Sequence, residues 1–189
     1  MPRVYMIRHG KPLSGWGDQG ADPDPGLDPH GLAQAEAGSR ALLALPERPH
    51  RVLTSPLRRC RETAAPFAAA IGVTPVIEAR VAEIPTPDRL SAGERAPWLR
   101  AAFQGTWGAI PGDLDYLAWR DAVAIAVAAH PGAAIFSHFV AINAAVSAAL
   151  GRPEVMMFRP DQGSITVFET DGERLTLIER GAEAETSVL

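Results

Sequence analysis

Polar side chains that suit phosphate chemistry stand at the ends of three short apolar runs. These polar pairs are Arg8-His9, Thr54-Ser55 and Ser137-His138. Because the carboxyl ends of parallel strands meet at one edge of a sheet, we expect the three pairs to lie close together. Arg59 follows Ser55 by four residues and would share its face of a helix. Two guanidiniums and two imidazoles at one edge suit a phosphate dianion, whose oxygens match the fork of arginine.

Such a site would support the transfer of a phosphoryl group to nitrogen. The neutral imidazole of His9 can attack phosphorus and form a phosphohistidine. Arg8, Arg59 and His138 would then stabilise the negative charge on the phosphoryl oxygens. The leaving oxygen needs a proton, and Glu83, just after the third expected strand, is the carboxylic acid that we place at the same edge.

The alternation of apolar runs with helix-like segments predicts the framework that positions these groups. Strands are expected at residues 3–9, 52–54, 73–79 and 133–136, followed by a hairpin of 165–169 and 175–178. Helices are expected at residues 29–45, 56–71, 114–129 and 139–150. Pro66 should kink the second helix or split it in two. This order predicts an α/β fold, a three-layer α/β/α sandwich with a mainly parallel sheet.

Two of these helices carry apolar side chains that should face the core. The first begins at an expected Asp28 N-cap and would bury Leu32, Ala35, Ala41, Leu42 and Leu45. The third would bury Leu117, Val123 and Val127. We expect both helices to cover the sheet.

Two segments interrupt the alternation. Residues 10–28 are rich in Gly, Pro and Asp and predict a long functional loop. Residues 80–113 predict a small cap excursion over one end of the sheet, helical around 95–104. Four aromatic side chains would either line its substrate side or pack the cap: Trp98, Trp107, Tyr116 and Trp119. We expect the whole chain, 1–189, to form a single domain with this excursion.

The composition narrows the class of protein. A hydrophobic content of 47% is typical of a globular protein, and no apolar run reaches the length of about 18 residues that a membrane span needs. The net charge of −4 argues against nucleic-acid binding, which needs a basic face. Cys60, the single cysteine, excludes an internal disulfide. With no signal-peptide pattern at the start, it favours a cytoplasmic protein.

Several stretches resemble the motifs of one known family. They are Arg8-His9-Gly10, the helix start Leu27–Ala35, the segment Ser55–Ala64, Glu83 and Ser137-His138. In order and spacing they resemble the histidine phosphatase superfamily, in its phosphoglycerate mutase-like branch. The resemblance covers roughly residues 3–150 and also residues 160–170. A lone Arg-His-Gly would be a weak signal, whereas this series is specific.

The resemblance implies a role for each group. His9 would be the nucleophile, and Arg8 and Arg59 would bind the phosphate. His138 would be the second histidine of the pocket, acting in both catalysis and phosphate binding. Glu83 matches the position of the family's proton donor. The family pattern Ser-x-Leu-x-Arg selects Arg59 from the arginines of its segment, and the family needs no metal, so we expect no metal and no cofactor.

The chain departs from the family pattern beside these motifs. Lys11 stands where many members have Glu or Gln, and would add positive charge over the pocket or remain a solvated loop residue. The family's loop Asn is absent from residues 11–28, where Ser14 is the candidate replacement. Phe139 replaces the usual Gly and would narrow the pocket mouth or pack inward. Residues 83–87 lack the family's continuation, which leaves the substrate-facing cap unmatched.

The leading hypothesis is a phosphomonoester hydrolase that acts through a phosphorylated His9. Its substrate would be a small phosphorylated molecule, with a phosphoprotein as the alternative. A phosphoglycerate mutase-type phosphotransferase would use the same chemistry but needs a second anion subsite. A phosphate-binding module without turnover would lack one catalytic group. A metal hydrolase using His9, His138 and Glu83 is disfavoured because these residues contain no compact pair of ligands.

Overall fold

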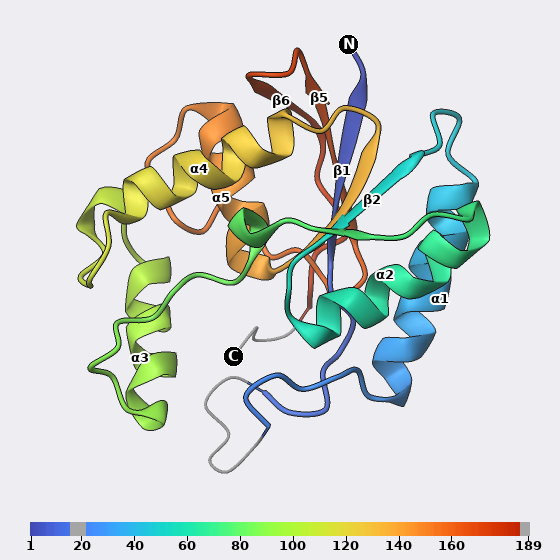
Figure 1. The fold of residues 1–189 in the computed structure, drawn as a ribbon. Coiled ribbons are helices and arrows are strands. Elements are labelled where there is room, and N and C mark those ends of the chain that lie inside the picture. The colour runs from blue at the N-terminus through green and yellow to red at the C-terminus, as the bar shows by residue number, and fades with distance from the viewer. Residues whose placement is uncertain (16–21, 186–189) are drawn as a thin grey trace.

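A six-stranded sheet forms the centre of the computed structural model, which describes residues 1–15 and 22–185 (Figure 1). The strand order is β3-β2-β4-β1-β5-β6. The strands are β1 (Arg3–Arg8), β2 (Arg51–Thr54), β3 (Val76–Ile77), β4 (Ala133–Ser137), β5 (Ile165–Thr170) and β6 (Leu175–Glu179). The pairs among β1 to β4 are parallel, whereas β5 pairs antiparallel with β1 and β6. The expected α/β fold with a mainly parallel sheet is therefore confirmed.

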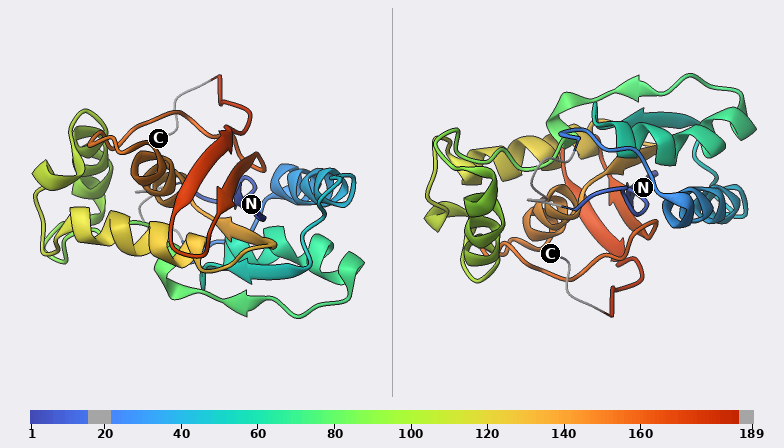
Figure 2. Two further views of the ribbon diagram at one scale, coloured as in Figure 1. Left: turned by 90° about the horizontal axis from the view of Figure 1, so that it is seen from above. Right: turned by 90° about the horizontal axis from the view of Figure 1, so that it is seen from below.

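Helices cover both faces of this sheet (Figure 2). The α-helices are α1 (Pro29–Leu43), α2 (Arg58–Ile71), α3 (Ala92–Phe103), α4 (Tyr116–Ala128) and α5 (Phe139–Leu150). Successive side chains of a strand point to opposite faces, so Tyr5 and Ile7 of β1 pack with α1 and α2, whereas Val4 and Met6 pack with α4 and α5. Burial on both faces fixes the register of β1 and hence the place of the residues that follow it.

The cap excursion lies beside the α4–α5 layer and is anchored by aromatic side chains. It holds two short 3₁₀ turns, Ala79–Val81 and Trp107–Ala109, on either side of α3. Trp107 donates to Ser147 of α5 at 2.9 Å, and Trp98 donates to the carbonyl of Pro111 at 2.7 Å. Buried indole groups with hydrogen-bond partners stabilise the cap. Of the two roles open to the tryptophans, packing is the one found.

Several local expectations differ from the structure. Pro66 lies inside an unbroken α2, because packing of α2 against α1 outweighs the one backbone hydrogen bond that proline removes. The expected strand 73–79 shrinks to the two exposed residues of β3, at the edge of the sheet. Leu32 and Leu117 are 51% and 40% exposed, since the apolar stripe of each helix is narrower than the sequence suggested. Ala41 is exposed as well.

Expected helices that cover the sheet are otherwise found within a few residues of their predicted ends. Asp28 caps α1 by accepting from the backbone N–H of Gly31 at 2.7 Å. Gly151 ends α5 in the left-handed conformation, with φ of 61°. No helix in the described part of the chain is long and apolar enough to cross a membrane.

Candidate active site

Three neighbouring strands bring the predicted polar residues together at their carboxyl ends. Arg8 pairs in register with Ser137, and Thr54 with Phe136, so β1, β4 and β2 end side by side. Five residues at or just beyond the ends of these strands are buried: Arg8, His9, Ser55, Arg59 and His138. The parallel sheet thus gathers charged side chains from distant parts of the chain.

His9 has one ring nitrogen fixed and the other turned to an arginine. Its Nδ1 lies 2.8 Å from the carbonyl oxygen of Gly10, which can only accept, so Nδ1 carries the proton. Arg59 donates from Nε to Nε2 of His9 at 3.3 Å. Burial, together with Arg59 and Arg8, holds the pKa of His9 well below its usual value. A neutral imidazole with a free electron pair on Nε2 is the form that can attack phosphorus.

His138 lies behind this pair, with its ring edge-on to His9 at 5.2 Å between centroids. Arg59 donates from Nη2 to Nδ1 of His138 at 3.3 Å, so the proton of the neutral ring is on Nε2. That Nε2 lies 2.8 Å from the hydroxyl of Ser55. Burial and the positive neighbours lower the pKa of His138 too. His138 is fully buried and does not line the cavity. It contacts the cavity-lining residue Arg59 instead.

Arg8 is buried but retains few partners. Its Nη1 donates to the carbonyl of Pro160 at 2.9 Å, and its guanidinium lies 5.2 Å from the ring centroid of Phe139. Within residues 1–15 and 22–185, its Nε has no hydrogen-bond partner. Burial chiefly lowers the pKa of Arg8, to about 10, which still leaves it charged at neutral pH. A buried charged donor without a full set of acceptors is suited to an anionic ligand.

Glu83 enters the site from the cap, one turn after the 3₁₀ segment Ala79–Val81. Its Oε2 lies 3.6 Å from Nδ1 of His138, and its Oε1 accepts from the N–H of Ile84 at 3.0 Å. Burial raises the pKa of Glu83, although Arg59 and Arg8 act against that shift. A carboxyl group that keeps its proton to a higher pH than usual can serve as a general acid.

Two glycines set the backbone beside His9. A Cβ on Gly10 would lie 2.5 Å from the carbonyl oxygen of Gly31, and a Cβ on Gly31 would lie 2.2 Å from that of Lys11. Gln34 of α1 accepts from the N–H of Lys11 at 2.8 Å. The motif at residues 27–35 therefore allows the start of α1 to pack closely against Gly10 and Lys11, next to His9.

Thr63 is a supporting residue that the sequence reasoning missed. Its hydroxyl accepts from the N–H of Gly10 at 3.0 Å and donates to the carbonyl of Arg59 at 2.6 Å. One side chain thus ties the loop after β1 to the first turn of α2. Its place in segment 55–64, four residues after Arg59, was the signal that could have found it.

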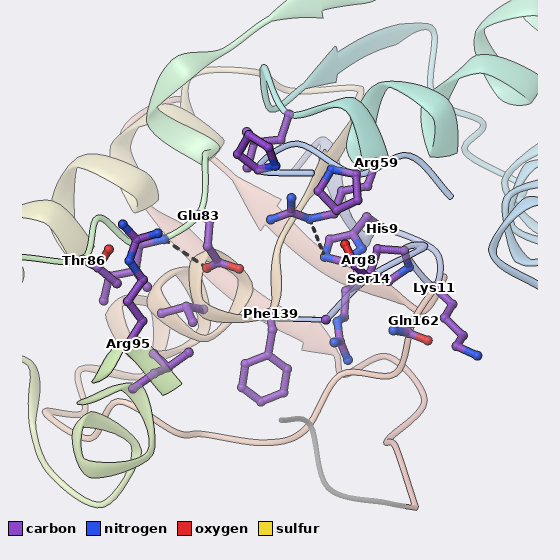
Figure 3. Close-up of a pocket in the computed structure, with 18 of the residues that line it drawn as sticks. Arg8, His9, Lys11, Ser14, Arg59, Glu83, Thr86, Arg95, Phe139 and Gln162 are labelled. Atoms are coloured by element: carbon purple, nitrogen blue, oxygen red, sulfur yellow. Dashed lines mark hydrogen bonds between the residues drawn. The ribbon is translucent and has the colours of Figure 1, made fainter. Parts of the chain in front are cut away.

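A cavity of about 640 Å³ opens over these groups (Figure 3). Arg8, His9, Arg59 and Glu83 line it, and Lys11 and Ser14 line it as well. Lys11 is exposed, and its Nζ forms an ion pair with the half-buried Asp28 at 3.1 Å. Ser14 is half-buried.

The residues that line the cavity can be compared with the other predictions for the pocket. Phe139 lines the cavity, and its ring packs on that of Phe103 with 5.4 Å between the ring centroids. Its side chain is therefore part of the packed cavity wall. The four aromatic residues that might have lined the substrate side do not line it. Residues 16–21 of the predicted loop 10–28 lie outside the described residues. Within the described ranges, no group of three or more His, Cys, Asp or Glu side chains is placed to hold a metal ion.

Comparison with known families agrees with this arrangement. The model of the histidine phosphatase superfamily (branch 1) matches residues 4–182. The chain belongs to this superfamily. The matched range includes all of the predicted motifs.

Solved structures of two phosphatases share the fold. A mycobacterial glucosyl-3-phosphoglycerate phosphatase in complex with inorganic phosphate is 24% identical, with a TM-score of 0.72, and the match covers 99% of this chain and 100% of that one. A phosphoserine phosphatase from Entamoeba histolytica, in complex with 3-phosphoglyceric acid, is 19% identical with a TM-score of 0.75, covering 96% and 98%. At these identities the likeness concerns the fold.

One curated protein is similar over a shorter stretch. Over 94 residues, 46% of this chain, the sequence is 35% identical to the transcription factor tau 55 kDa subunit of Saccharomyces cerevisiae. The aligned stretch spans only 21% of that protein. The chain therefore corresponds to about a fifth of the length of this relative.

Proposed function

We propose that the protein is a phosphomonoester hydrolase that acts through a phosphohistidine on His9. Nε2 of His9 forms a bond to phosphorus while the bond from phosphorus to the leaving oxygen breaks. Glu83 gives its proton to that oxygen. Glu83, now a carboxylate, takes a proton from water, whose oxygen attacks phosphorus, and phosphate leaves His9 with its imidazole restored.

The observation that carries this proposal is the fixed tautomer of His9 beneath two buried arginines. Proton donation from Nδ1 to Gly10 leaves Nε2 as the electron-pair donor, facing Arg59. Arg8 and Arg59 would replace these contacts by bidentate bonds to the phosphoryl oxygens, stabilising the negative charge of the transition state. This chemistry requires no metal ion, and we propose a metal-independent reaction on a small phosphorylated substrate.

The test is hydrolysis of 4-nitrophenyl phosphate in excess EDTA by the wild type and by the His9→Ala variant. We expect the wild type to release phosphate and the variant to lose at least about 10³-fold in kcat. Brief reaction followed by mass spectrometry should find an acid-labile phosphoryl group on His9. His50→Ala, which changes an exposed histidine, is the matched control and should retain wild-type activity.

Three results would contradict the proposal. They are the absence of phosphate release by the wild type, retained activity in His9→Ala, and activity that EDTA abolishes. The phosphotransferase alternative is distinguished in parallel: 3-phosphoglycerate with a bisphosphate primer should yield free phosphate, not the isomeric phosphoglycerate.

A further inference from the structure

The cavity extends past Glu83 to a second, separate end. Figure 3 shows Thr86 and Arg95 on the side of Glu83 that is away from His9. Cavities of about 300–1,000 Å³ hold whole small molecules, so one of about 640 Å³ has room for much more than a phosphoryl group. The organic part of a bound phosphomonoester would therefore occupy the remaining space.

The wall between the two ends is apolar. It is formed by side chains from the cap and from α5: Ile84, Leu99, Phe103, Phe139 and Val140. Phe139 stands here where the family usually has glycine, and it is held between Phe103 and the guanidinium of Arg8. A substrate in this cavity would pack a nonpolar middle section against this wall.

Among the four cations that line the cavity, three are already engaged. Arg8 binds the carbonyl of Pro160, Arg59 binds the two histidines, and Lys11 pairs with Asp28. A phosphate dianion would be balanced by the charges of Arg8 and Arg59. Asp22 and Lys11 both line the cavity, and the negative charge of Asp22 makes the surroundings of Lys11 less favourable for a further anion.

Arg95 is different, because its side chain is exposed and no hydrogen-bond or ion-pair partner for it exists in residues 1–15 and 22–185. The adjacent carboxylate, Glu94, is occupied: it accepts from the N–H and the hydroxyl of Ser91 at 2.9 and 2.6 Å. These bonds form the capping box of α3. A positive charge is thus left unpaired at the far end of a cavity whose near end is built for phosphate.

We propose that Arg95 is a specificity-determining residue that binds a second anionic group of the substrate. The inference rests on the proposed function, and it names the substrate class: a phosphomonoester with a nonpolar middle section and a carboxylate or similar anion beyond it. The apolar wall orients the middle section, and the guanidinium of Arg95 donates hydrogen bonds to the anion at its far end.

The test uses non-hydrolysable phosphonates, so that binding is measured without turnover. Calorimetry would give dissociation constants for benzylphosphonate and 4-carboxybenzylphosphonate, and for ethylphosphonate and 2-carboxyethylphosphonate as a shorter pair. We expect the wild type to favour the carboxylated member of at least one pair by about fivefold, the magnitude of a largely solvent-exposed ion pair. Arg95→Ala should abolish that preference, and added salt should weaken it in the wild type.

Arg100→Ala is the matched control, because Arg100 is an exposed arginine of the same helix that does not line the cavity. It should retain the preference, and Arg95→Lys should retain part of it. The inference is overturned if the wild type favours neither carboxylated phosphonate, if Arg95→Ala keeps the preference, or if no phosphonate binds. Hydrolysis without a preference would defeat this inference alone, whereas a preference without hydrolysis would defeat only the proposed function.

Discussion

The guanidinium Nε of Arg59 lies 3.3 Å from Nε2 of His9. The same guanidinium reaches His138 through Nη2, so Arg59 joins the two histidines. Since every nitrogen of arginine can only donate, these two contacts fix which nitrogen of each ring is unprotonated. Arg59 therefore organises the site as well as supplying positive charge to it.

Replacing Arg59 by lysine should lower kcat/KM for aryl phosphates by about 10²-fold, because a point charge loses the fork that holds phosphate and both rings. Arg58→Lys is the matched control, since Arg58 is exposed and pairs with Glu62 at 2.7 Å outside the cavity. It should remain within about twofold of wild type. Steady-state kinetics checks both, and equal losses in the two variants would refute the assignment of Arg59.

Glu83→Gln should reveal the proton donor through the leaving group. An alkyl phosphate, whose leaving oxygen needs a proton, should lose about 10²-fold or more in kcat, whereas 4-nitrophenyl phosphate should lose far less. Glu78→Gln serves as the control, since Glu78 is bound to Arg80 at 2.7 Å and does not line the cavity. Equal losses for both substrates would argue against Glu83 as the acid.

The pH dependence of alkyl phosphate hydrolysis follows from the same pKa shifts. Burial raises the pKa of Glu83, so kcat should stay high above pH 4.5, the group's ordinary pKa, and fall as pH rises further and the acid form is lost. The pKa of His9 is lowered, so its neutral form persists well below pH 6.5. Rate profiles of the wild type and Glu83→Gln should differ by this alkaline decline, and a decline of equal size in the variant would assign it elsewhere.

His138 should make the folded protein sensitive to mild acid. Its folded-state pKa lies below 6.5, so the unfolded chain binds more protons in this range and stability falls as pH decreases below about 6.5. The slope can reach about 1.4 kcal/mol per pH unit for one group. Urea denaturation between pH 7.5 and 5 should show a smaller loss for His138→Gln than for wild type. A constant difference between the two proteins would contradict this.

Gly31→Ala should be costly because its Cβ would lie 2.2 Å from the carbonyl oxygen of Lys11. We expect a loss of about 1–3 kcal/mol in the free energy of unfolding, with lower activity as the loop beside His9 shifts. Gly93→Ala, also in the first turn of an α-helix, meets nothing within 4 Å. That control should be neutral or slightly stabilising, and denaturant titrations of both proteins provide the measurement.

The superfamily, the parallel sheet and the positions of the motifs could be predicted from sequence, because they depend on local patterns. Apolar runs indicate buried strands, and a polar residue directly after such a run lies at the carboxyl end of its strand. The burial of Leu32 and Leu117 and the possible break of α2 at Pro66 were predicted wrongly. Each depends on which neighbour packs against the helix, and no local pattern contains that information.

By itself, the sequence determined which chemical groups meet: the alternation of apolar runs and helices predicts a parallel sheet, and Arg8, His9, Arg59 and His138 follow the carboxyl ends of its strands. Only the tertiary structure decided their states and surroundings. Burial and hydrogen bonds from distant segments set the tautomers and pKa values, and kept His138 behind the cavity wall. Among the residues that the structure describes, Arg95 of α3 has no ion-pair partner at the far end of the cavity. Such properties depend on distances between residues far apart in the chain, which periodicity does not encode.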